Sequence, residues 1–347
     1  MTRTVFGSLA RIADFDRNPY EVTAIDPSAW QTGDYVAAEV TGTPTRYYNI
    51  EDCVGDMVAV QPGTRVIGAL GVRAATLEGV GSWRDVRDGH MHALTSAGLF
   101  GVFTSYSRLL DDPISLVYTG HVCRGGKPLR MSQFALRHDG GTFRVPTIML
   151  VGTSMSAGKT TTGRLVIRLL SMAGYRVIGS KLTGAGRFRD ILAFRRAGAF
   201  EVYDFVDVGL PSTVVPEAHF RTAIRPLLNH IDSRGADFLV AEAGASPLEP
   251  YNGAAAIELI GDNNRMTILC ASDPYAVVGV QNAYQFKPDL VAGPAANTSA
   301  AIDLVDKLTG VPALNVLDPD AAEFLRTHLV ARLGVELESS DLAGALL

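Results

Sequence analysis

The chain has 347 residues, of which 47% are hydrophobic and 19% are charged. This balance excludes a chain that is disordered throughout, and the length predicts two domains. The net charge is −5 and no block of basic residues is present, so the composition argues against nucleic acid as a partner.

The cysteines and the apolar runs bear on the cellular compartment. Cys53, Cys123 and Cys270 are widely spaced and odd in number, a pattern typical of buried thiols in a reducing environment. The N-terminal residues form no apolar segment of signal-peptide length, and no run reaches the roughly 18 uninterrupted apolar residues of a membrane span. We therefore expect a soluble cytoplasmic protein without a membrane partner.

Residues 1–140 have the pattern of a β-rich domain, because Gly, Pro or Asp interrupts short apolar runs every few positions. The expected strands are Tyr35–Val40, Met57–Val60, Arg65–Leu70, Ile114–Tyr118 and His121–Cys123. The second and third of these predict a hairpin around Gln61-Pro62-Gly63, and the last two predict a pair around Gly120. The expected core residues are Trp83, Leu99 and Phe100. We expect a small β-barrel or sandwich with one or two helices, followed by a linker at Gly140-Gly141-Thr142.

Residues 146–347 have a different pattern, in which apolar runs alternate with amphipathic stretches. The runs are Thr147–Val151, Arg176–Ser180, Phe238–Ala241, Met266–Ala271 and Leu290–Ala292. Their nearly continuous apolar character is typical of strands buried on both faces. Apolar residues at helical spacing lie between them: Leu165, Leu169 and Met172, and then Phe220, Ile224 and Leu227. This alternation predicts an α/β domain with a doubly wound, mostly parallel sheet.

The segment TIMLVGTSMSAGKTTTG, residues 147–163, has the features of a phosphate-binding loop. A buried strand leads into a glycine-rich loop, and Lys159 and Thr160 open a helix. Gly152 and Gly158 let backbone N–H groups turn toward an anion, and the positive end of the helix adds to this field. Lys159 brings a charge to the β- and γ-phosphates, and the Thr160 hydroxyl can ligate Mg²⁺. The loop therefore predicts ATP and Mg²⁺ as cofactors.

The loop GTSMSAGKT, residues 152–160, resembles that of dethiobiotin synthetase and its relatives in the signal-recognition/MinD-type class of P-loop proteins. Those loops begin with Gly-Thr and keep five residues before Gly-Lys-Thr. Two further stretches are similar to that class, SKLTG at residues 180–184 and EAGA at residues 242–245. The resemblance implies that Lys181 lies near the phosphates and the substrate, and that Glu242 reaches the magnesium.

Residues 146–316 also resemble a family of two-domain P-loop proteins that includes D-glutamate N-acetyltransferases. The shared features are the Gly-Thr-x4-Gly-Lys loop, Thr161-Thr162 at the helix start, and an acidic, Gly-rich and Pro-containing segment after a strand. Ser154 stands where these relatives usually have Asp, and Ala243 and Ala245 replace Gly or Gln. This resemblance implies acylation of an amino acid by acetyl-CoA, and the wider class implies a homo-oligomer.

Residues at the ends of other strands are further candidates. Glu242 follows an apolar strand, where it can hold Mg²⁺ directly or through water, or cap the next helix. Lys181 is either a second phosphate clamp that stabilises charge during transfer or a solvated lysine. Asp207, in the segment EVYDFVDVGLPST, is either a second acid that binds Mg²⁺ or positions water, or a turn residue, and Asp204 is a weaker candidate.

Three loops supply candidates for recognition. Arg187 and Arg189 suit a carboxylate substrate, unless they lie on a solvated helix face. Ser246 opens the turn-rich loop SPLEPYNG, which we predict to bind substrate. Asn297 can pair with a purine edge or serve as a helix N-cap. The predicted nucleotide-binding residues are Gly152, Thr153, Ser154, Met155, Ser156, Ala157, Gly158, Lys159, Thr160, Thr161 and Asn297.

Other catalytic patterns are missing from the sequence. His90 and His92 form the only close histidine pair, and a surface loop is favoured over a metal site there. Neither a GxSxG elbow nor a GxGxxG dinucleotide fingerprint after the first strand of the second domain is present.

Three functions agree with these features. The first is an Mg-ATP-dependent enzyme of ligase or kinase type that transfers a phosphoryl group to a small carboxylate or amino-acid-like metabolite. Lys159, Lys181 and Glu242 would then be its catalytic residues. The second is an acetyl-CoA-dependent N-acyltransferase whose loop holds the phosphates of CoA, since a helix N-terminus binds any phosphate ester. The third is a non-catalytic nucleotide switch or metallochaperone.

Overall fold

The structure is a computed structural model, and it describes residues 3–43, 48–138 and 140–337. The chain divides into two compact units. Unit 1 comprises Met1–Arg137, Ala185–Arg189 and Phe205–Val215, and unit 2 comprises His138–Gly184, Asp190–Asp204 and Pro216–Leu347. The last part of the predicted second domain, residues 338–347, lies outside the described residues. No helix in the described part of the chain is both long enough and apolar enough to cross a bilayer.

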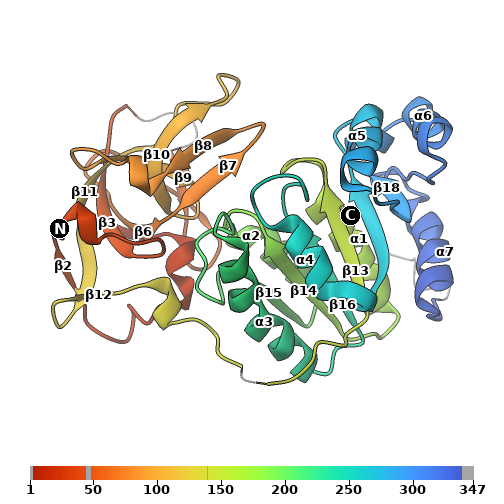
Figure 1. Ribbon diagram of the computed structural model, residues 1–347, viewed down its shortest axis with the longest axis horizontal. Helices are drawn as coiled ribbons and strands as arrows, with labels where there is room; N and C mark the ends of the chain where they lie inside the picture. Colours follow the sequence, from red (N-terminus) through yellow and green to blue (C-terminus); the bar gives the residue numbers. More distant parts are fainter. Residues whose placement is uncertain (1–2, 44–47, 139, 338–347) are drawn as a thin grey trace. The chain divides into compact units, whose positions relative to one another are not determined.

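Unit 1 is built on a small closed β-barrel (Figure 1). Its ring contains β6 (Arg65–Leu70), β3 (Tyr35–Thr41), β11 (Ser115–Arg124), β9 (His90–Thr95) and β10 (Leu99–Tyr106). Neighbours in the ring are antiparallel except β10 and β6, which pair in parallel and close it. The β-rich first domain is thus confirmed, with Leu99 and Phe100 fully buried and Trp83 partly buried against the core.

The first hairpin prediction is wrong. The strand β5 (Met57–Ala59) pairs with β4 (Asn49–Glu51), whereas β6 pairs with β3, β1 (Thr4–Phe6) and β10. The reason is burial. Every residue of β6 after Arg65 is buried, so this strand needs neighbours on both sides, while two of the three residues of β5 are exposed. In addition, the Gly63 amide donates to the Val40 carbonyl oxygen at 3.0 Å, which ties the turn to β3.

The predicted strand pair around Gly120 is also wrong, because β11 runs through this position as one strand with a local shift of register. The edge strand β2 (Glu21–Thr23) pairs with β11 here. A Cβ atom at Gly120 would lie 3.0 Å from the backbone nitrogen of Thr23. Glycine at this position therefore admits a neighbouring strand rather than a turn.

The helices expected in unit 1 are short 3₁₀ turns in the described residues. They are η1 (Ser8–Ile12), η2 (Pro27–Ala29), η3 (Trp83–Asp85) and η4 (Met131–Gln133). The remaining strands of the unit are β7 (Val72–Ala75), β8 (Gly79–Ser82) and β12 (Lys127–Pro128).

Unit 2 contains a six-stranded parallel sheet in the order β15-β14-β16-β13-β17-β18. Its strands are β13 (Thr147–Gly152), β14 (Val177–Thr183), β15 (Glu201–Asp204), β16 (Phe238–Ala243), β17 (Asn264–Cys270) and β18 (Leu290–Ala292). All five predicted strands are present. The sequence did not indicate β15, because this edge strand is short and only Asp204 in it is fully buried.

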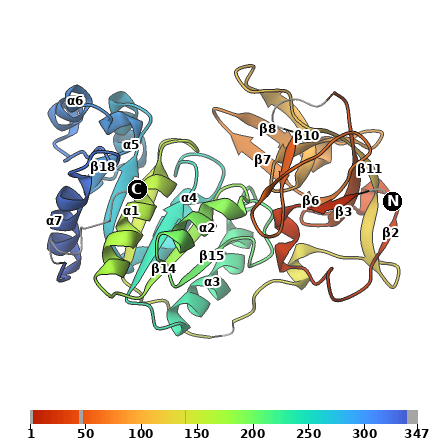
Figure 2. The same ribbon diagram turned by 180° about the vertical axis from the view of Figure 1, so that it is seen from behind.

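Helices cover both faces of this sheet. The helices α1 (Lys159–Met172) and α7 (Ala321–Leu333) pack on each other and on the central strands, and α3 (Glu217–Ser233) packs with α4 (Gly253–Ile260). The helix α4 lies in front of the sheet in Figure 1, and α1 lies in front of it in the reverse view of Figure 2. The doubly wound α/β domain is confirmed. The other helices are α2 (Phe188–Arg196), α5 (Pro274–Tyr284) and α6 (Ser299–Thr309).

Two segments that follow strands of unit 2 pack within unit 1. Residues 185–189 follow β14 and residues 205–215 follow β15, and the two are joined by a bridge between Ala185 and Ser212. The Ser212 hydroxyl donates to the Val72 carbonyl oxygen at 2.6 Å. Arg11 forms an ion pair with Asp207 at 3.1 Å. Local patterns in the sequence do not predict this packing, because the residues in these two contacts lie more than a hundred positions apart in the chain.

Candidate functional site

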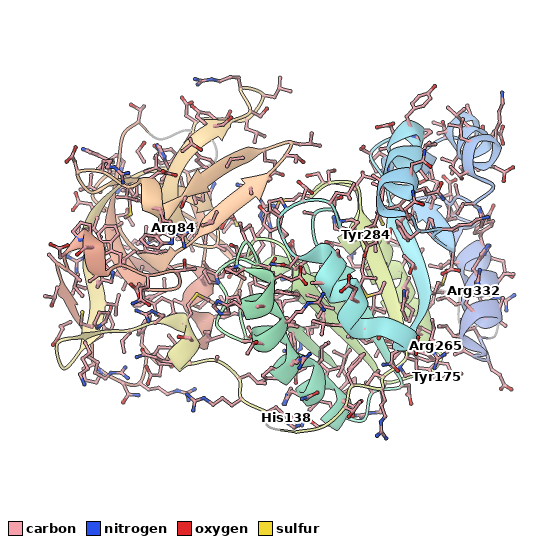
Figure 3. The ribbon with its side chains drawn as sticks, viewed as in Figure 1. Arg84, His138, Tyr175, Arg265, Tyr284 and Arg332 are labelled. Atoms are coloured by element: carbon pink, nitrogen blue, oxygen red, sulfur yellow. The ribbon has the colours of Figure 1, made fainter. Side chains whose placement is uncertain are left out.

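The candidate site lies at the edge of the unit 2 sheet where β13, β14 and β16 end. Because these strands are parallel neighbours, their carboxyl ends share one edge, the place where open α/β sheets bind ligands. Lys181 and Glu242 are register partners across β14 and β16, and Leu150 on β13 is level with Glu242. In Figure 3, Tyr175 and Arg265 mark the opposite edge, where β14 and β17 begin.

The glycines at both ends of the loop are required by its geometry. A Cβ atom on Gly152 would lie 2.5 Å from the Lys159 ammonium nitrogen and 2.8 Å from the Ala245 carbonyl oxygen. Gly158 has φ of +94°, which favours glycine, and it forms the N-cap of α1. Its carbonyl oxygen accepts hydrogen bonds from the Thr162 amide at 3.0 Å and from the Thr162 hydroxyl at 3.1 Å. Unit 2 therefore has the strand, loop and helix of a P-loop.

Lys159 is enclosed by the loop that it follows. Its side chain is buried, and its ammonium group donates to the Ser154 carbonyl oxygen at 2.7 Å and to that of Met155 at 3.5 Å. Burial lowers the pKa of Lys159, and the negative charge of Glu242 opposes this shift. An anion that displaced the two carbonyl oxygens would therefore meet an ammonium group already held inside the loop.

Thr160 and Glu242 bring together the two kinds of oxygen that Mg²⁺ binds. The Thr160 hydroxyl donates to the Glu242 carboxylate at 2.9 Å, and Glu242 is only 4% exposed. Residues 3–43, 48–138 and 140–337 contain no group of three or more His, Cys, Asp or Glu side chains that could hold a metal by themselves. A hydroxyl and one carboxylate suit Mg²⁺, which takes its remaining ligands from water and substrate phosphates. The donor set thus fits a magnesium-nucleotide complex.

Lys181 is held by a residue that the sequence analysis missed. Its ammonium group forms an ion pair with the Asp190 carboxylate at 2.5 Å, and the Lys181 side chain is buried. Asp190 lies in the first turn of α2, where a carboxylate also faces the positive end of the helix. The acidic residue that ends the segment RFRD, residues 187–190, was the available signal, but spacing alone does not reveal its partner.

Glu249 is a second residue that the sequence analysis missed. It lies in the loop SPLEPYNG, is 9% exposed, and its charge raises the pKa of Lys159, in the same direction as Glu242. Ala245, directly before this loop, and Asn252, near its end, have φ of +60° and +62°. Non-glycine residues adopt this conformation at a cost of about 1–3 kcal/mol each, which the surrounding structure must offset.

Cys270 is the last residue of β17, and it contacts the P-loop and the start of α1. Its thiol donates to the Thr162 hydroxyl at 3.4 Å, and the Thr153 amide donates to the Cys270 carbonyl oxygen at 3.0 Å. Burial raises the pKa of the Cys270 thiol to about 11. The side chain is therefore neutral at physiological pH and fills space beneath the loop.

Three other predicted site residues lie in unit 1. Asp207, the predicted third metal ligand, is paired with Arg11. Arg187 and Arg189 belong to the segment that follows β14, where Arg189 is exposed and Arg187 is half-buried. The geometry of unit 2 thus brings Thr160 and Glu242 together and does not include these residues.

The remaining candidates have simple local surroundings. Ser246 is buried, and its hydroxyl accepts a hydrogen bond from the Leu248 amide at 3.2 Å. Asn297 is exposed, and the N-cap of α6 is Thr298, whose side chain accepts from the Ala301 amide. The N-cap alternative for Asn297 is therefore wrong, since the neighbouring residue fills that position. His92, from the barrel, accepts a hydrogen bond from the Phe103 amide.

Comparison with known proteins gives matches to solved structures alone. No protein-family model matches the chain, and no curated protein matches it. A DUF1611 family protein from Anabaena variabilis has 18% identity and a TM-score of 0.36, and the match covers 55% of this chain and 58% of that one. The chain thus spans 58% of the length of the Anabaena protein.

Two further structures are similar to part of the chain. HypB from Helicobacter pylori, solved in complex with nickel, has 13% identity and a TM-score of 0.37, with 56% of this chain and 91% of HypB covered. A ParA family ATPase from Chlorobium tepidum has 13% identity and a TM-score of 0.31, with 58% of this chain and 98% of the ATPase covered. The fold assignment rests on the strand order and loop described above. Unit 2 has a P-loop NTPase fold.

Proposed function

We propose that this protein is an Mg-ATP-dependent enzyme that transfers a phosphoryl group to a small carboxylate or amino-acid-like metabolite. The observation that carries the proposal is the contact of Thr160 with Glu242 beside the buried Lys159. The P-loop lysine by itself can bind the phosphates of any phosphate ester, so it does not distinguish ATP from acetyl-CoA. A hydroxyl and a carboxylate at hydrogen-bond distance add a place for Mg²⁺, which a nucleotide triphosphate needs and an acyl-CoA does not.

Each residue has a role in this proposal. Loop amides and Lys159 bind the β- and γ-phosphates, while Thr160 and Glu242 hold Mg²⁺. Bound magnesium would supply positive charge that stabilises the phosphates. Lys181, kept in place by Asp190, neutralises the charge of the migrating phosphoryl group. The products of this step are ADP and an acyl phosphate. An amine then displaces phosphate from the acyl phosphate, and a ring closes where the amine belongs to the same molecule.

Ser246 and Asn297 have supporting roles in the same proposal. The roles predicted for Arg187, Arg189 and Asp207 stay predictions, because these three residues belong to unit 1. Ser246 and its loop contact the substrate, while Asn297 reads the nucleotide base. The assignments of Ser246 and Asn297 extend the proposal beyond Thr160, Glu242 and the P-loop, and each is tested by substitution with alanine.

The test is hydroxylamine trapping, because hydroxylamine converts an acyl phosphate into a coloured hydroxamate. Wild-type protein with MgATP and a panel of small carboxylates and amino acids is expected to give hydroxamate and ADP in equal amounts. Lys159→Ala is expected to give neither, while Lys287→Ala, which removes an exposed lysine outside the loop, retains both. Acetylated amino acid formed from acetyl-CoA without ADP would replace this proposal by the acyltransferase.

A further inference from the structure

Unit 1 contains a cavity of about 680 Å³. Its wall is formed by residues 3–6 in and before β1, by residues 10–17 in and after η1, and by residues 52–54 and Val58 around the turn between β4 and β5. The described residues that line the cavity all belong to unit 1. Small-molecule sites in proteins typically have volumes of about 300–1,000 Å³, so this cavity has room for a metabolite.

One part of the wall is apolar and is incompletely covered. Its side chains are those of Val5, Phe6, Ile12, Phe15, Val54 and Val58. Val54 is 68% exposed, and Phe6 and Phe15 are half-buried. Removing apolar surface from water is favourable in proportion to its area, so a ligand that covers these side chains gains affinity from its own apolar part.

Aromatic contacts hold this part of the wall in place. The centre of the Phe15 ring lies 6.0 Å from that of Phe6 and 5.0 Å from that of Tyr35. Tyr35 is fully buried, and its hydroxyl donates to the Leu9 carbonyl oxygen at 3.0 Å. Binding costs less when the contacting groups are already ordered. The two phenylalanine rings therefore offer a preformed surface, against which an aromatic ring can pack offset or edge-on.

The other part of the wall carries charges of both signs. The charged residues are Arg3, Arg11, Arg17, Asp14, Asp16 and Asp52. Asp14 forms an ion pair with Arg124 at 2.8 Å. One carboxylate oxygen of Asp52 accepts hydrogen bonds from the Val54 amide at 3.0 Å and the Asp56 amide at 2.9 Å. These two carboxylates are therefore satisfied by groups of unit 1 itself.

The charge of Arg3 has no such partner. Arg11 pairs with Asp207 at 3.1 Å, and Arg17 pairs with Asp16 at 3.6 Å. Arg3 is exposed, and in the part of the chain that the structure describes its side chain forms no hydrogen bond and no ion pair. A guanidinium group matches the geometry of a carboxylate. A nucleotide polyphosphate needs several cations, and three aspartates in the wall disfavour it.

We propose that this cavity is a binding site for a small carboxylate with an apolar, ring-containing body. The carboxylate pairs with Arg3, and the body covers Val54 and the rings of Phe6 and Phe15. The inference goes beyond the proposed function, since every contact that carries it lies within unit 1 and none involves the P-loop. Binding at this site requires neither Mg²⁺ nor a nucleotide.

Cys53 lines the cavity and can report whether it is occupied. This cysteine is half-buried, whereas Cys123 and Cys270 are fully buried, so it is the accessible thiol of the three. Burial raises the pKa of the Cys53 thiol to about 11, so labelling by N-ethylmaleimide is slow and is followed by peptide mass spectrometry at about pH 8.5. The probe is hydrocinnamate, a phenyl ring joined to a carboxylate. At ten times its dissociation constant about a tenth of the protein stays free, so labelling should slow about tenfold.

Two analogues separate the parts of the probe. Hydrocinnamamide keeps the shape without the charge, and succinate keeps charge without the ring. Fragments of this size bind with dissociation constants of about 1 mM or weaker, so all three are used up to about 30 mM at constant ionic strength. Each analogue should slow labelling by less than about twofold, and MgATP should have no effect. Equal protection by hydrocinnamamide, protection by MgATP, or no protection by hydrocinnamate overturns the proposal.

Substitution of Arg3 tests the assignment of the carboxylate. Arg3→Gln should raise the hydrocinnamate concentration that halves the labelling rate by at least about tenfold. The matched control is Arg65→Gln, which removes an exposed arginine from β6, the strand that pairs with β1, outside the cavity. It should change that concentration by less than about twofold. Equal half-protection concentrations for wild type and Arg3→Gln overturn the proposal.

A second readout does not depend on the thiol. Both tryptophans of the chain, Trp30 and Trp83, belong to unit 1, so their fluorescence follows the thermal unfolding of this unit. Hydrocinnamate should raise the midpoint for wild type and for Val80→Asp, a partly exposed position of β8 outside the cavity. It should not raise the midpoint for Val54→Asp, which places a negative charge on the exposed apolar rim. An equal rise for both variants contradicts the assigned site.

Discussion

Replacing Glu242 with glutamine tests the magnesium site with the smallest change in shape. Glu242→Gln removes a negative charge but keeps an oxygen that can accept the hydrogen bond from Thr160. The fold is therefore expected to survive. Magnesium loses the carboxylate that Glu242 would supply, whereas the P-loop amides and Lys159 remain available for phosphate.

The expected size of the effect follows from that single ligand. Loss of a carboxylate that binds or orients a metal typically lowers affinity about 10- to 100-fold, which corresponds to about 1.4–2.7 kcal/mol. Turnover measured at fixed ATP against increasing Mg²⁺ should therefore reach half its maximum at about 10- to 100-fold higher free Mg²⁺. The matched control is Glu258→Gln, which removes an exposed glutamate that pairs with Arg221 on the surface. It should leave the titration unchanged.

Two results would refute this reasoning. An identical Mg²⁺ titration for Glu242→Gln and wild type shows that the carboxylate is not near the metal. A complete loss of folded protein, measured by circular dichroism, shows that Glu242 serves the structure first. In the second case the Mg²⁺ titration is repeated with Thr160→Val, which removes the neighbouring hydroxyl and leaves the carboxylate.

The remaining predictions concern stability. Phe194→Ala should lower the free energy of unfolding, measured in urea, by about 3–5 kcal/mol, because the buried Phe194 ring fills the space beside Gly163 and Gly179. The control is Phe324→Ala, which removes a partly exposed ring and should lower it by less than about 1 kcal/mol. Gly244→Ala should destabilise by more than about 1 kcal/mol, since its Cβ atom would lie 2.1 Å from the Thr183 carbonyl oxygen; urea melts equal to wild type would contradict this. The pKa of Cys270 rises from 9.0 to about 11, so its stabilisation is present below pH 9 and is lost as pH rises through 11. The stability difference between wild type and Cys270→Ala should narrow by about 2–3 kcal/mol over that window, and a constant difference would show that the thiol is not buried in solution.

Local features of the sequence predicted the P-loop and the sheet around it. Gly152 and Gly158 are glycines because other atoms lie too close to leave room for a Cβ atom, or because the backbone has a positive φ, and both reasons are local. The apolar runs of unit 2 are long enough to require burial on both faces of the sheet. The barrel was harder because its strands pair across distance. Residues 65–70 follow β5 in sequence, yet their burial demands other partners.

The contacts that complete the candidate site depend on residues far apart in the chain. Nothing in the sequence around Asp190 or Glu249 distinguishes them from other acidic residues. In the structure Asp190 forms an ion pair with Lys181, and the charge of Glu249 acts on Lys159. The roles predicted for Asp207 and Asn297 stay predictions, because they depend on a bound nucleotide and substrate.

The central claim, that the loop of unit 2 binds a magnesium-nucleotide through Lys159, is tested most directly by calorimetric titration of the full chain with ATP. With Mg²⁺ present, wild type should bind and Lys159→Ala should lose at least about 100-fold in affinity, which is about 2.7 kcal/mol. Removing Mg²⁺ with EDTA should weaken binding to wild type. Equal affinity of the two proteins for MgATP, or binding of acetyl-CoA in its place, would contradict the account.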